Sequence, residues 1–196
     1  MNSESSSALD RFIRGRAATM LAFVWGIAEA TFFFLVPDVL LTLMACRAIR
    51  PALKGTVAAL AGALIGGVAM CVFGYYSPGE ARSFLDYVPA ISPALIASVE
   101  ADIDRHGLLS LMLGPLKGTP YKIYAVEWGA RAGSFAGFLL ISIPARYVRF
   151  FLASLLARAL ARIIEPFTKR RVRIEVLIFA LVWIGFYSFY FSRFGW

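Results

Sequence analysis

Long apolar stretches separated by short polar segments dominate the chain. The first, residues 17–46, carries only two charges, Glu29 and Asp38. A single helix of about 30 residues would measure about 45 Å, which exceeds the roughly 30 Å hydrocarbon core of a bilayer. Pro37 lacks an amide hydrogen and disfavours helix at Val36, so a bend is predicted there. We therefore expect residues 17–46 to form a re-entrant helical hairpin whose two ends lie on the same side.

Residues 55–79 form the next apolar stretch, which contains no charge and is long enough to cross a bilayer once. Small residues recur along it at intervals of four positions, in two rows: Ala59, Ala63 and Gly67, and Gly62 and Gly66. Rows of small residues let a second helix approach closely in lipid. We interpret this span as a packing helix and its glycines as packing residues rather than ligand contacts.

The chain then becomes polar before a second broken apolar stretch. Residues 80–105 carry five acids against two bases, which suits the outer side of a membrane, and an amphipathic helix is predicted for residues 93–105. Residues 108–131 have an apolar arm too short to cross, and four helix-breaking residues interrupt it: Gly114, Pro115, Gly118 and Pro120. This pattern predicts a second re-entrant hairpin that enters from the opposite side.

These elements predict an all-α integral membrane protein. Its fold would be an inverted repeat of two re-entrant helical hairpins, each followed by a transmembrane helix, plus a C-terminal transmembrane helix over residues 176–192. The second crossing falls on residues 132–157. We divide the chain into a tail with a short interfacial helix (1–16), a membrane domain (17–162) and a basic cytoplasmic segment with the last helix (163–196). The first seven residues, MNSESSS, have the composition of a disordered tail.

Composition and charge support a membrane location. The chain is 60% hydrophobic and 16% charged, with a mean hydropathy of +0.72, whereas soluble domains are roughly 45–50% apolar. The formal charge is +8, but the bases flank apolar spans, where anionic lipid headgroups explain them better than nucleic acid. Their distribution predicts a cytoplasmic N-terminus and a C-terminus outside. The first apolar stretch is too long for a signal-peptide core, so we expect it to be retained.

Ionisable side chains inside the predicted spans are the candidate chemistry. Each costs about 2.5–3.5 kcal/mol on insertion scales and usually marks function. The first hairpin carries the acids Glu29 and Asp38, and the second carries Lys117 and Lys122, with Arg131 at its exit. The two hairpins would therefore present opposite charges to one cavity.

Two arginines of the second crossing are expected to reach the same cavity. Arg146 and Arg149 are three residues apart, which places them on one face of a helix. An excess of positive charge suits a phosphate, which arginine holds bidentately and lysine as a point charge. Glu29 or Asp38 can carry a proton during turnover, because a low dielectric favours the neutral carboxyl. In the alternative interpretation, the pairs only neutralise one another as structural salt bridges.

Several of these motifs resemble a known family. The sequences EATFF (residues 29–33) and PDVLL (37–41) resemble the signature of the DedA superfamily, also called the VTT or SNARE-associated domain, and particularly its YqaA-like branch. The sequences GPLKGTPYK (114–122) and RYVRFF (146–151), with Gly129 and Phe138 between them, resemble that branch's second hairpin and following helix. The resemblance extends over roughly residues 17–162.

This resemblance implies two facing re-entrant loops and movement of a lipid phosphate, either a polyisoprenyl phosphate or a phospholipid, between leaflets. The expected protein is a transporter or scramblase of the bacterial inner (plasma) membrane. By motif, the acid pair falls on Glu29 and Asp38, and the basic pair on Lys117 and Lys122. The chain departs from the family where Asp38 follows proline directly, and where lysines replace arginines. Glu127 stands in a stretch that is usually apolar and can pair with Lys122 or Arg131.

Other functions receive weaker support from the sequence. A structural or adaptor protein, whose intramembrane charges only lock helices together, is the main alternative. We expect no enzyme, because no aspartate cluster for Mg²⁺ and no nucleophile with its base is present. No cofactor or metal is expected, since Cys46, Cys71 and the lone His106 match no ligand spacing. The expected partners are an anionic lipid or lipid phosphate and the membrane, not nucleic acid, and a homo-oligomer is left open.

Overall fold

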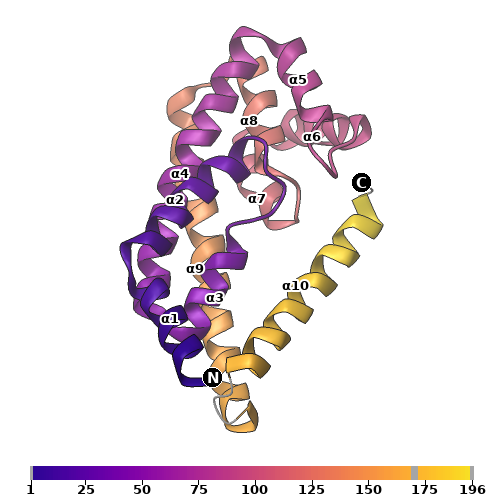
Figure 1. The fold of residues 1–196 in the computed structure, drawn as a ribbon. Helices are drawn as coiled ribbons and strands as arrows, with labels where there is room; N and C mark the ends of the chain where they lie inside the picture. The colour runs from indigo at the N-terminus through magenta and orange to yellow at the C-terminus, as the bar shows by residue number, and fades with distance from the viewer. Residues whose placement is uncertain (1, 169–171, 195–196) are drawn as a thin grey trace.

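Figure 1 shows the fold in a computed structural model, which describes residues 2–168 and 172–194. Every regular element in these two ranges is helical. The elements in chain order are α1 (Asn2–Arg14), α2 (Arg16–Thr31), α3 (Asp38–Arg47), α4 (Ile49–Tyr76), α5 (Pro78–Asp86), α6 (Pro93–His106), a 3₁₀ turn (Gly107–Leu109), α7 (Ser110–Leu116), α8 (Tyr121–Ala130), α9 (Phe135–Thr168) and α10 (Val172–Phe194).

Two antiparallel helices, α2 and α3, form the first hairpin with the loop of residues 32–37. The helix breaks before Asp38, as the proline in the sequence predicts. The indole Nε1 of Trp25 donates to the Leu35 carbonyl at 2.9 Å, which ties the loop back to α2. At the open end, Arg47 Nε lies 2.9 Å from Asp10 Oδ1 of α1. The start of α2 and the end of α3 therefore lie at the same end of the molecule (Figure 1).

The second hairpin consists of α7, the turn of residues 117–120, and α8. Gly118 has a φ of +95° in this turn, a conformation that glycine adopts without the steric cost of a Cβ. Pro120 immediately precedes α8, where its fixed φ suits a helix start. Gly118 and Pro120 therefore interrupt the helix as predicted, whereas Gly114 and Pro115 lie inside α7 and do not.

The tips of the two hairpins meet beside the middle of α4. A Cβ added at Gly66 would lie 2.8 Å from the Ile27 carbonyl oxygen and 2.9 Å from the Ala30 Cβ. A Cβ at the next residue, Gly67, would collide with the ring of Tyr121, the first residue of α8. The predicted packing role of the small residues is confirmed, because they let both hairpins approach α4 at backbone distance.

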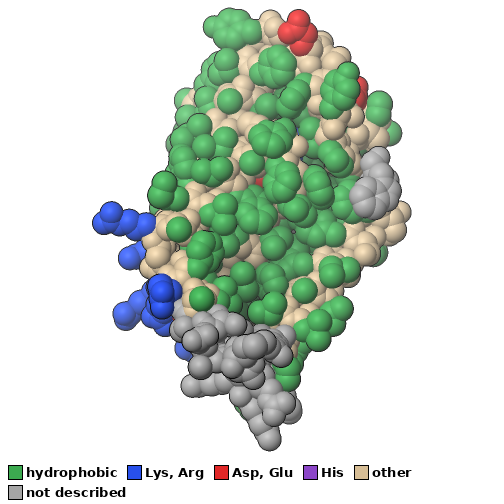
Figure 2. Space-filling view, viewed as in Figure 1, with side chains coloured by type: hydrophobic (Ala, Val, Ile, Leu, Met, Phe, Trp, Pro, Cys, Tyr) green, Lys and Arg blue, Asp and Glu red, His purple; other side chains and the backbone are tan. Residues whose placement is uncertain are grey.

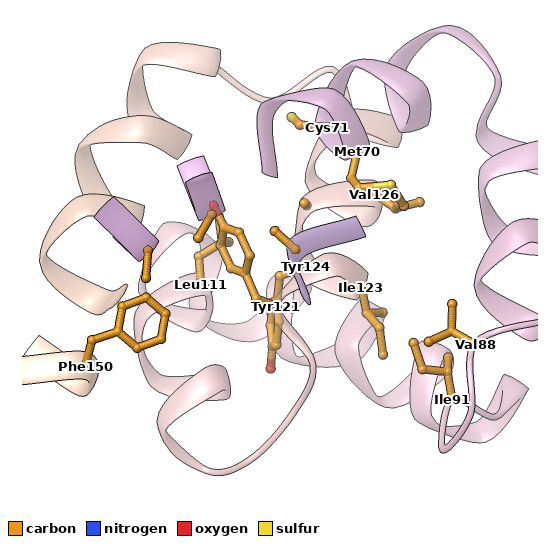
Figure 3. Packing of buried hydrophobic residues seen from close by; sticks show 14 of the residues in the cluster. Met70, Cys71, Val88, Ile91, Leu111, Tyr121, Ile123, Tyr124, Val126 and Phe150 are labelled. Atoms are coloured by element: carbon orange, nitrogen blue, oxygen red, sulfur yellow. The ribbon is translucent and has the colours of Figure 1, made fainter. Parts of the chain in front are cut away.

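The second hairpin is surrounded by buried apolar side chains. Ile123 and Val126 of α8 are fully buried. Figure 3 shows side chains of α8 packed among neighbours from α4, α7 and α9, including Met70, Cys71, Leu111 and Phe150. This dense packing fixes the position of the polar side chains that α8 carries.

Among the described residues, two helices are long and apolar enough to cross a membrane: α4 and the part of α9 over Phe135–Pro166. Val176–Ser192 of α10 is a shorter apolar helix. On the face shown in Figure 2, hydrophobic side chains cover the middle of the molecule, Lys and Arg lie near α1, and Asp and Glu lie near α5. These features are compatible with a membrane protein.

Several boundaries differ from those predicted from the sequence. Residues 2–7 belong to α1 instead of a disordered tail, because extending an existing helix costs far less than starting one. The helix of the second predicted crossing continues beyond residue 157, since α9 extends to Thr168, and Arg158 Nη1 donates to the Cys46 carbonyl at 2.9 Å. The polar segment contains α5, which starts at Pro78. Part of the predicted basic segment, residues 169–171, lies outside the described residues.

Candidate functional site

Two acids of the first hairpin are paired with two arginines of α9. The Arg146 guanidinium contacts the Glu29 carboxylate, and their side chains are 0% and 4% exposed. One turn along α9, Arg149 Nη2 lies 2.9 Å from Asp38 Oδ2. Because residues three apart share a helix face, α9 presents both arginines to the hairpin. The predicted approach of these four side chains is confirmed.

Lys122 of the second hairpin joins the same group. It is 2% exposed, and its Nζ donates to the Phe33 carbonyl in the tip of the first hairpin at 3.2 Å. A cation in the first turn of a helix is unfavourable with respect to the helix dipole. The buried position of Lys122 is therefore explained by groups outside α8. We call Glu29, Asp38, Lys122, Arg146 and Arg149 the inner cluster.

Arg146 has hydrogen-bonding capacity that its neighbours do not use. Its Nε and Nη1 atoms are buried and have no hydrogen-bond partner among the described residues. The guanidinium carbon lies 4.6 Å from the centroid of the Tyr121 ring and 5.0 Å from that of the Phe150 ring. The two rings favour the cation electrostatically but accept no conventional hydrogen bond from these atoms. Buried polar groups without a partner are rare and call for an explanation.

The inner cluster has a surplus of positive charge. Three of its members are basic and two are acidic, so with every group ionised it holds one positive charge more than its acids neutralise. A buried unpaired charge is strongly unfavourable. An anion with several oxygens would balance the charge and accept hydrogen bonds from the free atoms of Arg146.

A second group of charges lies where α5, α6 and α8 meet. Arg82 donates to both oxygens of Glu127 at 2.8 and 2.7 Å, and to Glu100 at 2.7 Å. Arg131 Nη1 donates to Glu127 at 2.9 Å, and its Nε donates to Asp104 at 3.2 Å. We call these five residues the outer clamp, because they join three helices outside the hairpin tips.

The outer clamp stabilises the ionised forms of its members. The hydrogen bonds that Arg82 donates to Glu127 raise the pKa of Arg82, although partial burial opposes the shift. Burial alone would raise the pKa of Glu127, but the hydrogen bond and the charge of Arg82 outweigh it, so this pKa lies below its ordinary value. The clamp is thus a network of mutually stabilising charges.

Three further residues were considered from the sequence, and one of them, Arg131, lies elsewhere than predicted. Arg131 was expected at the charged cavity, but it belongs to the outer clamp, because nine residues of helix separate it from Lys122 by about 13 Å. Of the two partners considered for Glu127, the structure selects Arg131. Lys117 is exposed in the turn of the second hairpin, and its role as a binding residue stays a prediction.

The sequence did not indicate the aromatic part of the site. Tyr121 is 1% exposed beneath Arg146, and its hydroxyl donates to Ser142 Oγ at 2.8 Å. Tyr187 of α10 accepts a hydrogen bond from the Val36 amide in the first loop at 2.9 Å. For Tyr121, its position next to Lys122 in the sequence could have indicated that it belongs to the site. No such signal exists for Tyr187, which by sequence looks like an interfacial anchor.

Within the described parts of the chain, no three His, Cys, Asp or Glu side chains group together as metal ligands. Asp102 and Asp104, the nearest approach to an acidic motif, have other partners: Asp102 accepts from Tyr124 at 2.7 Å, and Asp104 pairs with Arg131. Comparisons with protein-family models, with curated proteins and with solved structures give no match. The candidate site therefore stands on its geometry.

Proposed function

We propose that this protein is a member of the DedA superfamily that lies in the bacterial inner membrane and moves a lipid phosphate between leaflets. The two hairpins would be re-entrant, with their tips meeting near the bilayer midplane. The inner cluster would bind the phosphate group, and Arg146 would be its principal ligand. The lipid would be a polyisoprenyl phosphate or a phospholipid.

The observation that carries the proposal is the unused capacity of Arg146. This buried cation has two free nitrogen donors within a cluster that has one excess positive charge. A phosphate has the oxygens and the negative charge that such a site lacks. Lys122 and Arg149 would supply further positive charge at the same place.

The arrangement of the hairpins supports a transport function. The first hairpin opens toward the end that carries α1, and the second opens toward the end that carries α5 and α6 (Figure 1). Broken helices that meet near the midplane are a recurrent design in transporters, because non-helical backbone is tolerated there only beside protein or a polar cavity. The basic residues near α1 would place that end in the cytoplasm.

The acids suggest how transport could be coupled to protons. A phosphate on Nε and Nη1 of Arg146 would share the guanidinium with Glu29, which contacts Nη2. Two anions on one cation repel each other, which favours the protonated form of a buried carboxyl group. Glu29 would thus take up a proton when lipid binds and release it when the lipid leaves, and Asp38 would act similarly beside Arg149.

A structural or adaptor protein is the second candidate. The observation that favours it is that each acid of the inner cluster already contacts one arginine. In that case the pairs would only hold α2 and α3 against α9. A stoichiometric protein partner, with no lipid movement by the purified protein, would support this candidate.

A leaflet-exchange assay on purified protein in vesicles tests the proposal. We would compare a fluorescent phosphatidic acid with the corresponding phosphatidylcholine. The double variant Glu29→Gln/Arg146→Gln replaces the inner pair by neutral groups of similar size and should slow phosphatidic acid exchange at least about tenfold, equivalent to ~1.4 kcal/mol of lost stabilisation. The matched control Arg82→Gln/Glu127→Gln neutralises an outer pair and should exchange at the wild-type rate. Wild-type exchange by the inner double variant would contradict the proposal.

A further inference from the structure

An apolar groove lies between the first hairpin and α10. Its volume is about 790 Å³, within the roughly 300–1,000 Å³ typical of ligand sites. Residues of the loop and of α3 form one wall, and residues of α10 form the other. The lining consists mainly of apolar and aromatic side chains, including Trp25, Phe34, Leu35, Val39, Ile184 and Phe191.

The groove exists because α10 touches the hairpin through a few aromatic side chains. Trp183 Nε1 donates to Thr42 Oγ1 at 3.2 Å, and Tyr187 accepts from the Val36 amide. The Phe34 ring meets the Tyr187 and Phe191 rings at centroid distances of 6.3 and 5.5 Å. Figure 1 shows α10 rising beside the bundle from the end that also carries α1. These side chains connect the two walls of the groove and also set the distance between them.

The groove lies next to the inner cluster. Leu35 and Val39 of the groove wall flank the segment that contains Asp38, and Asp38 is paired with Arg149. The Arg149 side chain is 22% exposed, whereas that of Arg146 is fully buried. The apolar wall therefore adjoins the segment that pairs with the more accessible arginine of the cluster.

We propose that this groove holds one hydrocarbon chain of the transported lipid, with the phosphate at Arg149 and Arg146. This inference rests on the proposed function and deepens it by assigning the route from the side, between α10 and the first hairpin. A hydrocarbon chain is the occupant because the lining is apolar along its length while the adjoining charge is cationic. A polar solute would leave most of the lining without a complementary partner.

Photolabelling of the full chain in vesicles tests the assignment. The probe is phosphatidic acid with a diazirine in its acyl chain, and labelled residues are located by mass spectrometry. The variant Ser188→Trp fills the groove from α10. The control Val182→Trp adds the same ring on another face of α10, where Val182 is 63% exposed.

We expect labelling to concentrate on groove residues such as Val39 and Ile184. Excess unlabelled phosphatidic acid, or the Ser188→Trp substitution, should reduce it about tenfold, as for a loss of ~1.4 kcal/mol in binding. Val182→Trp should leave it unchanged. Equal labelling of the exposed residues Val57 and Leu140 would overturn the assignment. Cross-linking of α10 to a second copy, with no lipid labelling of the groove, would overturn it as well.

The same preparations separate this inference from the proposed function. If Ser188→Trp exchanges phosphatidic acid at the wild-type rate, the groove is not the route, although the proposed function stands. If the wild-type protein exchanges no lipid phosphate, the proposed function fails whatever the labelling pattern.

Discussion

The inner cluster and the outer clamp each contain five charged residues, but they use their charges differently. In the outer clamp, Glu127 accepts from two arginines, and Arg82 and Arg131 each contact more than one acid. Acids outnumber bases there, and several members are exposed to solvent, including 67% of the Asp104 side chain. In the inner cluster, bases outnumber acids, and Arg146 is buried with two unused donors.

Under the proposed function, this difference distinguishes a structural network from a binding site. Water can hydrate the surplus charge of the outer clamp, so no ligand is needed to explain it. The inner cluster has less access to water, since Arg146 is fully buried and the Arg149 side chain is 22% exposed, and its surplus charge therefore favours a bound anion. The experiments below weaken each group in turn, and they are ordered from the largest expected effect to the smallest.

Removing the charge of Arg146 should have the largest effect. Arg146→Gln leaves Glu29 buried without its cation, which costs about 3–5 kcal/mol of stability for a broken buried pair. The unfolding temperature of the purified protein should fall by roughly 2–4 °C for each kcal/mol. The double variant Glu29→Gln/Arg146→Gln should recover much of this stability without recovering lipid exchange. A double variant as unstable as Arg146→Gln would contradict a direct pairing of the two side chains.

Separating the hairpin tips from α4 should have the next largest effect. Gly66→Val places new methyl groups against the Ile27 backbone, which cannot rotate away, and overpacking costs typically 1–3 kcal/mol. We expect a lower unfolding temperature and slower lipid exchange, because the inner cluster is assembled from both hairpins. The control Gly185→Val adds the same side chain on α10, where no atom lies within 4 Å of the new Cβ. Equal destabilisation by both variants would contradict the packing described for α4.

Weakening the outer clamp should affect stability more than transport. Glu127→Gln removes one charge that two arginines share, but Arg82 and Arg131 are 41% and 28% exposed and can be hydrated. We expect a loss of about 1–2 kcal/mol in unfolding measurements. Lipid exchange per folded molecule should remain near the wild-type value. A tenfold loss of exchange would place Glu127 in the transport site and end the distinction between the two groups.

The smallest expected effect is a loss of clamp stability in acid. The pKa of Glu127 is lowered in the folded protein, so its contribution is fully present above the ordinary glutamate pKa of about 4.3 and is lost as the pH falls through the folded value. The difference in unfolding temperature between wild type and Glu127→Gln should therefore shrink below about pH 4. A difference that grows in acid would contradict the assigned direction.

The sequence predicted local breaks better than long-range pairings. The break directly before α3 follows from Pro37, although α2 already ends at Thr31, and the turn of the second hairpin follows from Gly118 and Pro120. These residues restrict or release the backbone locally. The contact between Glu29 and Arg146 joins residues 117 positions apart. The opposite charges indicated that acids of the first hairpin should meet basic residues. Charge alone could not distinguish Arg146 from Arg131, which lies at the far end of α8 and therefore belongs to the outer clamp. The prediction of a disordered tail over the first seven residues was also wrong for residues 2–7. Composition does not show that an adjacent helix can extend into a polar segment.

The most direct test of the central claim is a density map of the protein in a lipid nanodisc supplied with phosphatidic acid. The account predicts a phosphate within hydrogen-bonding distance of Arg146 Nη1 or Nε, with its hydrocarbon chain directed toward α10. Density in which protein groups or water satisfy both nitrogens, with no phosphate at the inner cluster, would contradict it.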